Sequence, residues 1–188
     1  MNDSLEKAFN QWEIYCRDQT MRALTEDQRR CHQAFKTSTY EQHKNINPNR
    51  TEGTCEWALK SSEYQHWWES SCNDLLWLSA DPGCGKSVFV KSLVDNIFNT
   101  SIPNVSVCYF FFKDNDEQNN LATALCAILH QLFGMQPQLL QHTLPSWEKN
   151  HTKVQQKVDE LWRILMDTGS IPSTRHWPIM QPVDDAIT

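Results

Sequence analysis

The segment SADPGCGKS at residues 79–87 constrains this chain more than any other stretch. The 188-residue sequence contains only five glycines, and two of them, Gly83 and Gly85, stand two positions apart beside Lys86. Glycine lacks a Cβ and adopts positive φ at little cost, so such a loop can turn its backbone N–H groups toward one point. Residues 80–87 fit the phosphate-binding pattern G-x-x-x-x-G-K-[ST] at every position except the first, where Ala80 replaces glycine. The pattern predicts a phosphate-binding loop.

The residues around this loop predict a strand before it and a helix after it. An apolar run at 75–78 is too short for a helix and suits a strand that is buried on both faces. From Ser87 to Phe98, apolar residues recur at helical spacing. A second apolar run at 105–112 predicts another strand, and amphipathic helices are expected around 121–133 and 154–166. Alternating strands and helices predict an α/β domain with a parallel sheet.

The rest of the chain divides into a helical prefix and a C-terminal tail. Apolar spacing predicts a helix over 3–17, and a capping-box pattern that begins at Thr25 predicts a second helix to about Phe35. The stretch 45–53 lacks periodicity and carries Asn, Pro and Gly, which is typical of a linker, and short Trp-rich helices follow it up to residue 70. We therefore expect a helical prefix and linker at 1–49, the main domain at 50–168 and an irregular or disordered tail at 169–188.

Charge and cysteine usage exclude several classes of protein. Lys and Arg number 17 against 23 Asp and Glu, which gives a net charge of −6, and no basic run is present to bind nucleic acid. The seven cysteines are never spaced as CxxC, which argues against a disulfide framework and a zinc site. The N-terminus has no signal-peptide core, and the longest apolar run is VCYFFF at 107–112. These features predict a cytoplasmic protein with neither a membrane span nor a nucleic acid partner.

A phosphate-binding loop would bind its ligand mainly through the backbone. Lys86 is expected to reach the β- and γ-phosphates of ATP or GTP, and the Ser87 hydroxyl is expected to bind Mg²⁺. The choice between ATP and GTP stays open, because base recognition lies outside the loop. The expected nucleotide-binding residues are Ala80, Asp81, Pro82, Gly83, Cys84, Gly85, Lys86, Ser87 and Val88.

Two further features allow more than one interpretation. Cys84 could be a redox sensor beside a helix N-terminus, but the requirement of the loop for a small residue is the favoured explanation. Asp114, after the second strand, is a candidate Mg²⁺ partner, and the competing interpretation places it with Asp116 and Glu117 in a solvated loop. No catalytic residue is assigned.

Three separated segments carry a family resemblance: NPNRTEGTCEWAL, LLWLSADPGCGKSVFVKSLVD and VCYFFFKDNDEQNNLATALCAILHQLF. Together they resemble the start of the NACHT domain of fungal STAND proteins, NOD-like receptors often described by a nephrocystin-like N-terminal module, over about residues 25–168. The resemblance implies a partial P-loop NTPase parallel sheet flanked by helices, with an N-terminal helical segment. It also implies a nucleotide-binding signalling switch, with Lys86 and Ser87 as the loop lysine and hydroxyl. Similarity suggests that Gly53 and Thr54 lie near the adenine, whereas the residues themselves favour a linker turn and a helix N-cap.

The resemblance ends after residue 168. The second acidic motif of the family, its winged-helix region and its repeats are not found, so we expect residues 169–188 to be a truncated or mis-spliced end and the module to bind nucleotide with little or no hydrolysis. A different possibility is a helical interaction module that binds no nucleotide and self-associates or binds proteins through its N-terminal helices. A stand-alone P-loop kinase is less favoured, because only Arg163 and Arg175 follow Ser87 to clamp a transferred phosphate.

Overall fold

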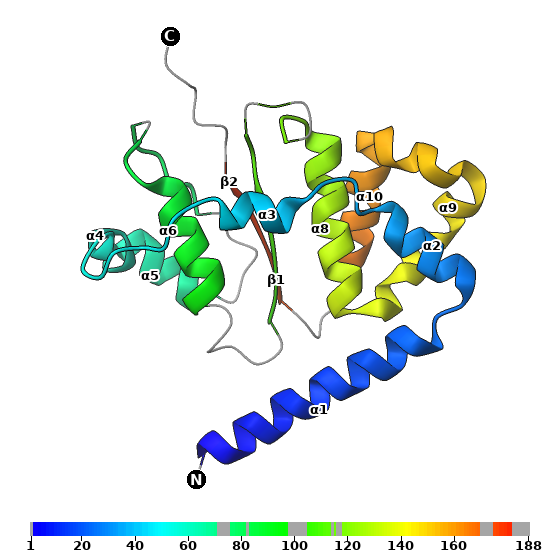
Figure 1. Ribbon diagram of the computed structural model, residues 1–188, viewed down its shortest axis with the longest axis horizontal. Helices are drawn as coiled ribbons and strands as arrows, with labels where there is room; N and C mark the ends of the chain where they lie inside the picture. Colours follow the sequence, from blue (N-terminus) through cyan, green and yellow to red (C-terminus); the bar gives the residue numbers. More distant parts are fainter. Residues whose placement is uncertain are drawn as a thin grey trace.

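The computed structural model describes residues 2–70, 76–81, 83–97, 105–113, 115, 118–169 and 175–181. Helices predominate in this part of the chain, and two strands, β1 (Val105–Phe111) and β2 (Arg175–Gln181), form one small sheet. The strands pair in parallel, with Val105 opposite Arg175 and Phe111 opposite Gln181. In Figure 1 this ribbon lies between a group formed by α4, α5 and α6 and a group formed by α2, α8, α9 and α10.

The expected parallel sheet of a P-loop NTPase, flanked by helices, is wrong for this structure. Residues 76–78, predicted as the strand before the loop, have no regular secondary structure, and Leu75 lies outside the described residues. The side chain of Trp77 is 73% exposed, which a strand buried on both faces would not allow. Strand β1 is confirmed, but its partner is β2 rather than the segment before the loop. The described fold is mostly helical, with a two-stranded ribbon.

The C-terminal tail contains one element that the sequence did not predict. Strand β2 lies within 169–188, so the expectation of an irregular segment is wrong for residues 175–181. A parallel partner supplies its backbone hydrogen bonds, and β1 is the one neighbour of β2 within the described residues, so Pro178, which has no N–H, stands in an edge strand, where proline is tolerated. Residues 170–174 and 182–188 lie outside the described part, so the expectation stays a prediction for them.

The prefix consists of three helices: α1 (Asn2–Ala23), α2 (Glu26–Ala34) and α3 (Tyr40–Asn45). The predicted capping box of α2 is confirmed: the Thr25 hydroxyl accepts from the Gln28 N–H at 3.2 Å, and the Gln28 side-chain oxygen accepts from the Thr25 N–H at 2.9 Å. Helix α3 was not predicted, and its short polar sequence gives no apolar period. Figure 1 shows α1 extending away from the rest of the molecule, and Met21 near its end packs against the core.

The larger hydrophobic cluster, here called the large core, surrounds α8 (Leu121–Met135). Helix α8 is the predicted helix at 121–133, and it contacts β1, α2 and the following segments η2 (Pro137–His142), η3 (His151–Gln156) and α10 (Val158–Gly169). Helix α9 (Leu144–Asn150) packs on the same core through Leu144 and Trp147. Phe35 from α2's C-cap and Phe133 from α8 meet edge to face, with ring centroids 5.6 Å apart. The members of the large core include Phe35, Phe110, Leu125, Leu129, Phe133, Leu140 and Ile164, all fully buried or nearly so.

The small core joins the helices on the other side of the ribbon. These are α4 (Glu56–Leu59), α5 (Ser62–Glu69) and α6 (Lys86–Ser92), the last of which continues as the π-helical segment η1 (Leu93–Ile97). The small core consists of Ala58, Tyr64, Phe89 and Leu93, with partly buried side chains around them. Through Phe89, the small core fixes the helix that follows the glycine-rich loop.

Candidate functional site

The glycine-rich loop turns sharply into α6, as the sequence predicted. Gly83 and Gly85 have φ angles of 77° and 91°, and Gly85 is the N-cap of α6 in the left-handed conformation. A Cβ built at either position would meet no atom within 4 Å, so the backbone angle and not a lack of space calls for glycine there. Pro82 lies outside the described residues.

Lys86 folds back over the start of the loop. Its ammonium donates hydrogen bonds to the backbone carbonyl of Ala80 at 2.8 Å and to that of Asp81 at 3.1 Å. The Cys84 N–H donates to the Asp81 carbonyl at 3.3 Å. The loop is therefore closed on itself, with the lysine ammonium against its first two residues and an exposed outer side at Asp81, Gly83 and Cys84.

Ser87 and Val88 lie in the first turn of α6 and are half-buried. The N–H of Phe89 donates to the Gly85 carbonyl at 2.9 Å, which begins the helical ladder directly after the loop. The structure thus brings together the described members of the predicted set, which are Ala80, Asp81, Gly83, Cys84, Gly85, Lys86, Ser87 and Val88. Their role in binding a nucleotide stays a prediction.

A small hollow beside Lys86, here called the loop hollow, joins the loop to the segment before α5. Five of its residues were not predicted as site residues: Cys55, Trp57, Ala58, Leu78 and Phe89. The indole of Trp57 is 65% exposed. Among these, Trp57 had one signal in the sequence, the Trp-rich composition after the linker. The full lining is Cys55, Trp57, Ala58, Leu78, Ala80, Cys84, Gly85, Lys86 and Phe89.

Gly53 and Thr54, suggested by similarity to lie near an adenine, form a turn. The Thr54 hydroxyl and its N–H both donate to the Thr51 carbonyl, at 2.6 Å and 3.1 Å, and Gly53 has a φ of 80°. The N-cap of α4 is Cys55 and not Thr54, so the N-cap interpretation is wrong, whereas the linker turn is confirmed. The proximity of these residues to an adenine stays a prediction.

A polar cluster fixes the other end of α6 to the prefix. Asp95 in η1 accepts a hydrogen bond from Lys44 in α3, and its carboxylate lies 3.4 Å from the Lys91 ammonium. Lys91 also donates to the side chain of Asn49. Burial alone would raise the pKa of Asp95, but the two lysines outweigh it and hold that pKa below its ordinary value. The helix that begins at the loop is therefore tied to residues 44–49.

The other residues singled out in the sequence add no further group to this site. Asp114, Asp116 and Glu117 lie outside the described residues, so the candidate Mg²⁺ role of Asp114 stays a prediction. Within the described ranges, no cluster of three His, Cys, Asp or Glu side chains is placed to bind a metal ion. The same ranges contain no helix with the length and apolar character needed to span a membrane.

Comparison with known proteins agrees with the family resemblance. The chain is 31% identical to Vegetative incompatibility protein HET-E-1 of Podospora anserina over 87 residues. These residues are 46% of this chain but only 6% of that protein, so the chain spans a small part of this relative's length. No solved structure matches the chain. The family model described as Nephrocystin 3, N-terminal matches residues 53–185, which is more than half of the chain and includes the whole glycine-rich loop. The chain therefore belongs to the Nephrocystin 3, N-terminal family.

Proposed function

We propose that residues 80–88 bind the phosphates of ATP or GTP and that the chain is the nucleotide-responsive part of a signalling module of the NACHT type. The observation that carries this proposal is the position of Lys86, whose ammonium folds back onto the loop and lies against the Ala80 and Asp81 carbonyls at its start. A phosphate that enters the loop would exchange these carbonyls for charge-assisted contacts with the same ammonium.

The chemistry of the loop suits an anion rather than a cation. Lys86 supplies a positive charge, and Gly83 and Gly85 have the left-handed φ angles that a loop needs to turn successive backbone N–H groups toward an anion. The membership of the family and the name of the Podospora relative, an incompatibility protein, support a role in signalling. Asp81 is exposed at the rim of the loop, where its charge is largely screened by solvent.

Mg²⁺ fits this proposal as a companion of the nucleotide. Ser87 follows Lys86 directly and offers one hydroxyl oxygen, which is a ligand type that Mg²⁺ accepts. Mg²⁺ retains several waters and takes further oxygens from the phosphates, so one protein ligand in the loop is sufficient for a bound metal–nucleotide complex. The ion would neutralise part of the charge of the phosphates.

Calorimetric titration of the full chain with MgATP and MgGTP tests the proposal. We expect binding by the wild type and a loss of about 1.5–3 kcal/mol in Lys86→Ala, which is roughly ten- to a hundredfold in affinity, because the variant loses a charged phosphate contact. Lys149→Ala is the matched control, since Lys149 is an exposed lysine on α9, far from the loop in sequence. It should bind like the wild type.

The outcome that contradicts the proposal is equally definite. A wild-type chain that melts cooperatively but binds neither nucleotide at about 1 mM, an affinity near −4 kcal/mol, has no functional phosphate loop. Equal binding by the wild type and Lys86→Ala would place the nucleotide elsewhere.

A helical interaction module is the second candidate, and α1 favours it. Trp12, Ile14 and Tyr15 are more than half exposed, at 63%, 56% and 55%. Met21, which packs on the large core, is nine residues from Trp12, and at about 100° per residue the two lie on opposite sides of the helix. The Trp12 side of α1 is therefore available to a protein partner. A folded chain that ignores nucleotides in the titration above would support this candidate.

A further inference from the structure

Two cysteines from separate segments lie at the loop hollow. Cys55 is the N-cap of α4, and Cys84 stands between the two glycines of the loop. Both line the hollow together with Lys86. Nothing in the proposed phosphate site requires two thiols at this position, because the expected contacts of the loop come from its backbone.

These two thiols differ from the other cysteines that the structure describes. Cys84 is exposed and Cys55 is half-buried, so small oxidants can reach them. Cys31, Cys108 and Cys126 are buried, and burial raises the pKa of each thiol to about 12, which leaves little reactive thiolate. Cys16 is exposed but belongs to α1, and it does not line the hollow.

A disulfide between the two cysteines requires the loop to move toward Cys55. A disulfide forms when the two Cα atoms come within about 4.4–6.8 Å. Cys84 has a glycine in the left-handed conformation on each side, and these are soft positions of the backbone. The small core holds α4 against α6 through Ala58 and Phe89, and Cys55 packs against this cluster. We infer that the loop, rather than the core, supplies the movement that brings the two Cα atoms into this range.

The backbone of Cys55 is itself strained. Its φ of 58° is left-handed, a conformation that is unfavourable for a residue with a Cβ and that glycine adopts freely. A thiol is present where the backbone alone favours glycine.

We propose that Cys55 and Cys84 are a reversible redox pair that a hydroperoxide converts into a disulfide across the loop hollow. The exposed Cys84 sulfur attacks hydrogen peroxide, which gives a sulfenic acid and one water. The Cys55 sulfur then displaces the sulfenic hydroxyl as a second water, and the S–S bond forms. The two thiols lose two electrons and two protons in total, and the peroxide is reduced to two waters.

The disulfide would regulate the loop, and this part rests on the proposed function. A bond from Cys84 to Cys55 fixes the middle of the loop to the first residue before α4 and draws it toward the hollow. The N–H groups of the loop then lose the arrangement that a phosphate requires. We expect the affinity for MgATP or MgGTP to fall roughly tenfold or more on oxidation and to return on reduction.

Mass spectrometry of the full chain tests the thiol chemistry without reference to nucleotide. The reduced protein is treated at low concentration with hydrogen peroxide, the remaining thiols are alkylated, and the peptides are mapped without reduction. We expect a monomer that has lost two hydrogens, about 2 Da, with a peptide that joins Cys55 to Cys84. Cys55→Ser and Cys84→Ser should abolish this peptide, and Cys16→Ser, the control at an exposed thiol, should retain it.

The outcomes separate the two proposals. Three results would overturn the redox pair. Oxidation could stop at a sulfenic acid on Cys84, it could join Cys84 to another cysteine or to a second chain, or it could fail altogether. If the disulfide forms but the reduced chain binds no nucleotide, the proposed function fails and the redox pair stands. If reduced wild type binds nucleotide, Cys55→Ser should bind it with equal affinity before and after peroxide, and a loss of binding in that variant on oxidation would overturn the regulatory role.

Discussion

His32, which is buried, and His130, which is half-buried, form a stacked pair whose protonation opposes folding. Their rings stack at a centroid distance of 4.4 Å, the Tyr40 hydroxyl lies 2.8 Å from His130 Nδ1, and His32 Nε2 lies 3.0 Å from the His130 carbonyl. Burial, followed by the charges of His32 and Lys36, lowers the pKa of His130 to about 4 from its ordinary 6.5. Burial also lowers the pKa of His32. The folded chain therefore favours two neutral rings.

This pair predicts a loss of stability in mild acid. Since the folded pKa of His130 is below the unfolded value, its contribution is fully present above pH 6.5 and is lost as the pH falls from 6.5 toward 4. We expect the free energy of unfolding to fall by on the order of 1 kcal/mol between about pH 7 and pH 5, a figure reduced from the full shift because His130 is partly exposed. Urea denaturation at both pH values measures it.

The matched variants assign the effect to the pair. His130→Gln removes the titrating ring, so it should be less stable at pH 7 but lose less on acidification. His66→Gln changes an exposed histidine and should follow the wild type. An equal acid loss in His130→Gln and the wild type would exclude this pair as the origin.

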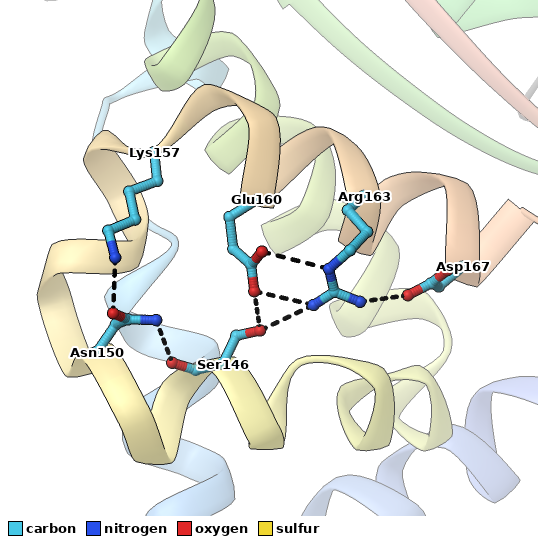
Figure 2. A network of polar contacts seen from close by, with 6 residues as sticks. All are labelled: Ser146, Asn150, Lys157, Glu160, Arg163 and Asp167. Carbon is cyan, nitrogen blue, oxygen red and sulfur yellow. Dashed lines mark hydrogen bonds and ion pairs between the residues drawn. The ribbon is translucent and has the colours of Figure 1, made fainter.

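Side chains of α9 and α10 form a polar bridge between the two helices. Figure 2 shows Ser146 of α9 between Glu160 and Arg163 of α10: its hydroxyl donates to Glu160 and accepts from Arg163 at 2.9 Å. Arg163 also binds Glu160 and, at 2.6 Å, Asp167. Hydrogen bonds from Arg163 and Ser146 lower the pKa of Glu160 to about 2. The bridge joins two helices that are separated by η3.

The bridge should stabilise the folded chain at neutral pH. Glu160→Gln loses the charge-assisted bonds to Arg163, and we expect a loss of about 1 kcal/mol in the free energy of unfolding, because the bridge is partly exposed. The depressed pKa means that the wild-type contribution is present above pH 4.5 and disappears as the pH falls toward 2, so the two proteins should converge in acid.

Urea denaturation at about pH 7 and pH 3 provides the comparison. Asp18→Asn is the control, since Asp18 pairs with Arg22 at 2.7 Å on α1 and both side chains are more than half exposed. Its removal should change stability by less than about 0.5 kcal/mol. A Glu160→Gln variant as stable as the wild type at pH 7 would show that the bridge contributes nothing.

Elements that carry their own signal were predictable from the sequence, and elements that depend on a partner were not. Helix α8 repeats apolar residues at helical spacing, and α2 carries a capping box, so both were correct. The run at 76–78 is equally compatible with a strand and with an irregular segment, and no partner strand is paired with it in the structure. Strand β2 is stabilised by its pairing with β1, and no local sequence pattern predicts that pairing.

The sequence predicted the glycine-rich loop of the candidate site but not the residues that α4 brings to it. The glycine-rich loop is contiguous, so its pattern of Gly83, Gly85 and Lys86 was readable directly. Cys55 and Trp57 come to the loop hollow because α4 packs against α6 in the small core. That contact joins segments about 30 residues apart and leaves no trace in residue spacing, so it could only be found in the structure.

The two cores should also differ in their resistance to opening. The large core surrounds α8 with fully buried side chains from several elements, whereas the small core has fewer buried residues and includes half-exposed loop neighbours. Local opening requires less free energy where less apolar surface is buried. We therefore expect native-state hydrogen exchange to be slowest in α8, faster in α4 to α6 and fastest in α1, which extends from the body of the molecule (Figure 1).

Two phenylalanine variants turn this order into a test, because Phe89 belongs to the small core and Phe133 to the large core. Phe89→Ala should speed exchange in α4 to α6 and leave α8 protected. Phe133→Ala, at a cost of about 3–5 kcal/mol, should speed exchange throughout, since the small core depends on a folded large core through β1. Equal acceleration of both regions by Phe89→Ala would mean that the chain opens as one cooperative unit, and then a ligand at the loop would protect α8 as strongly as α6.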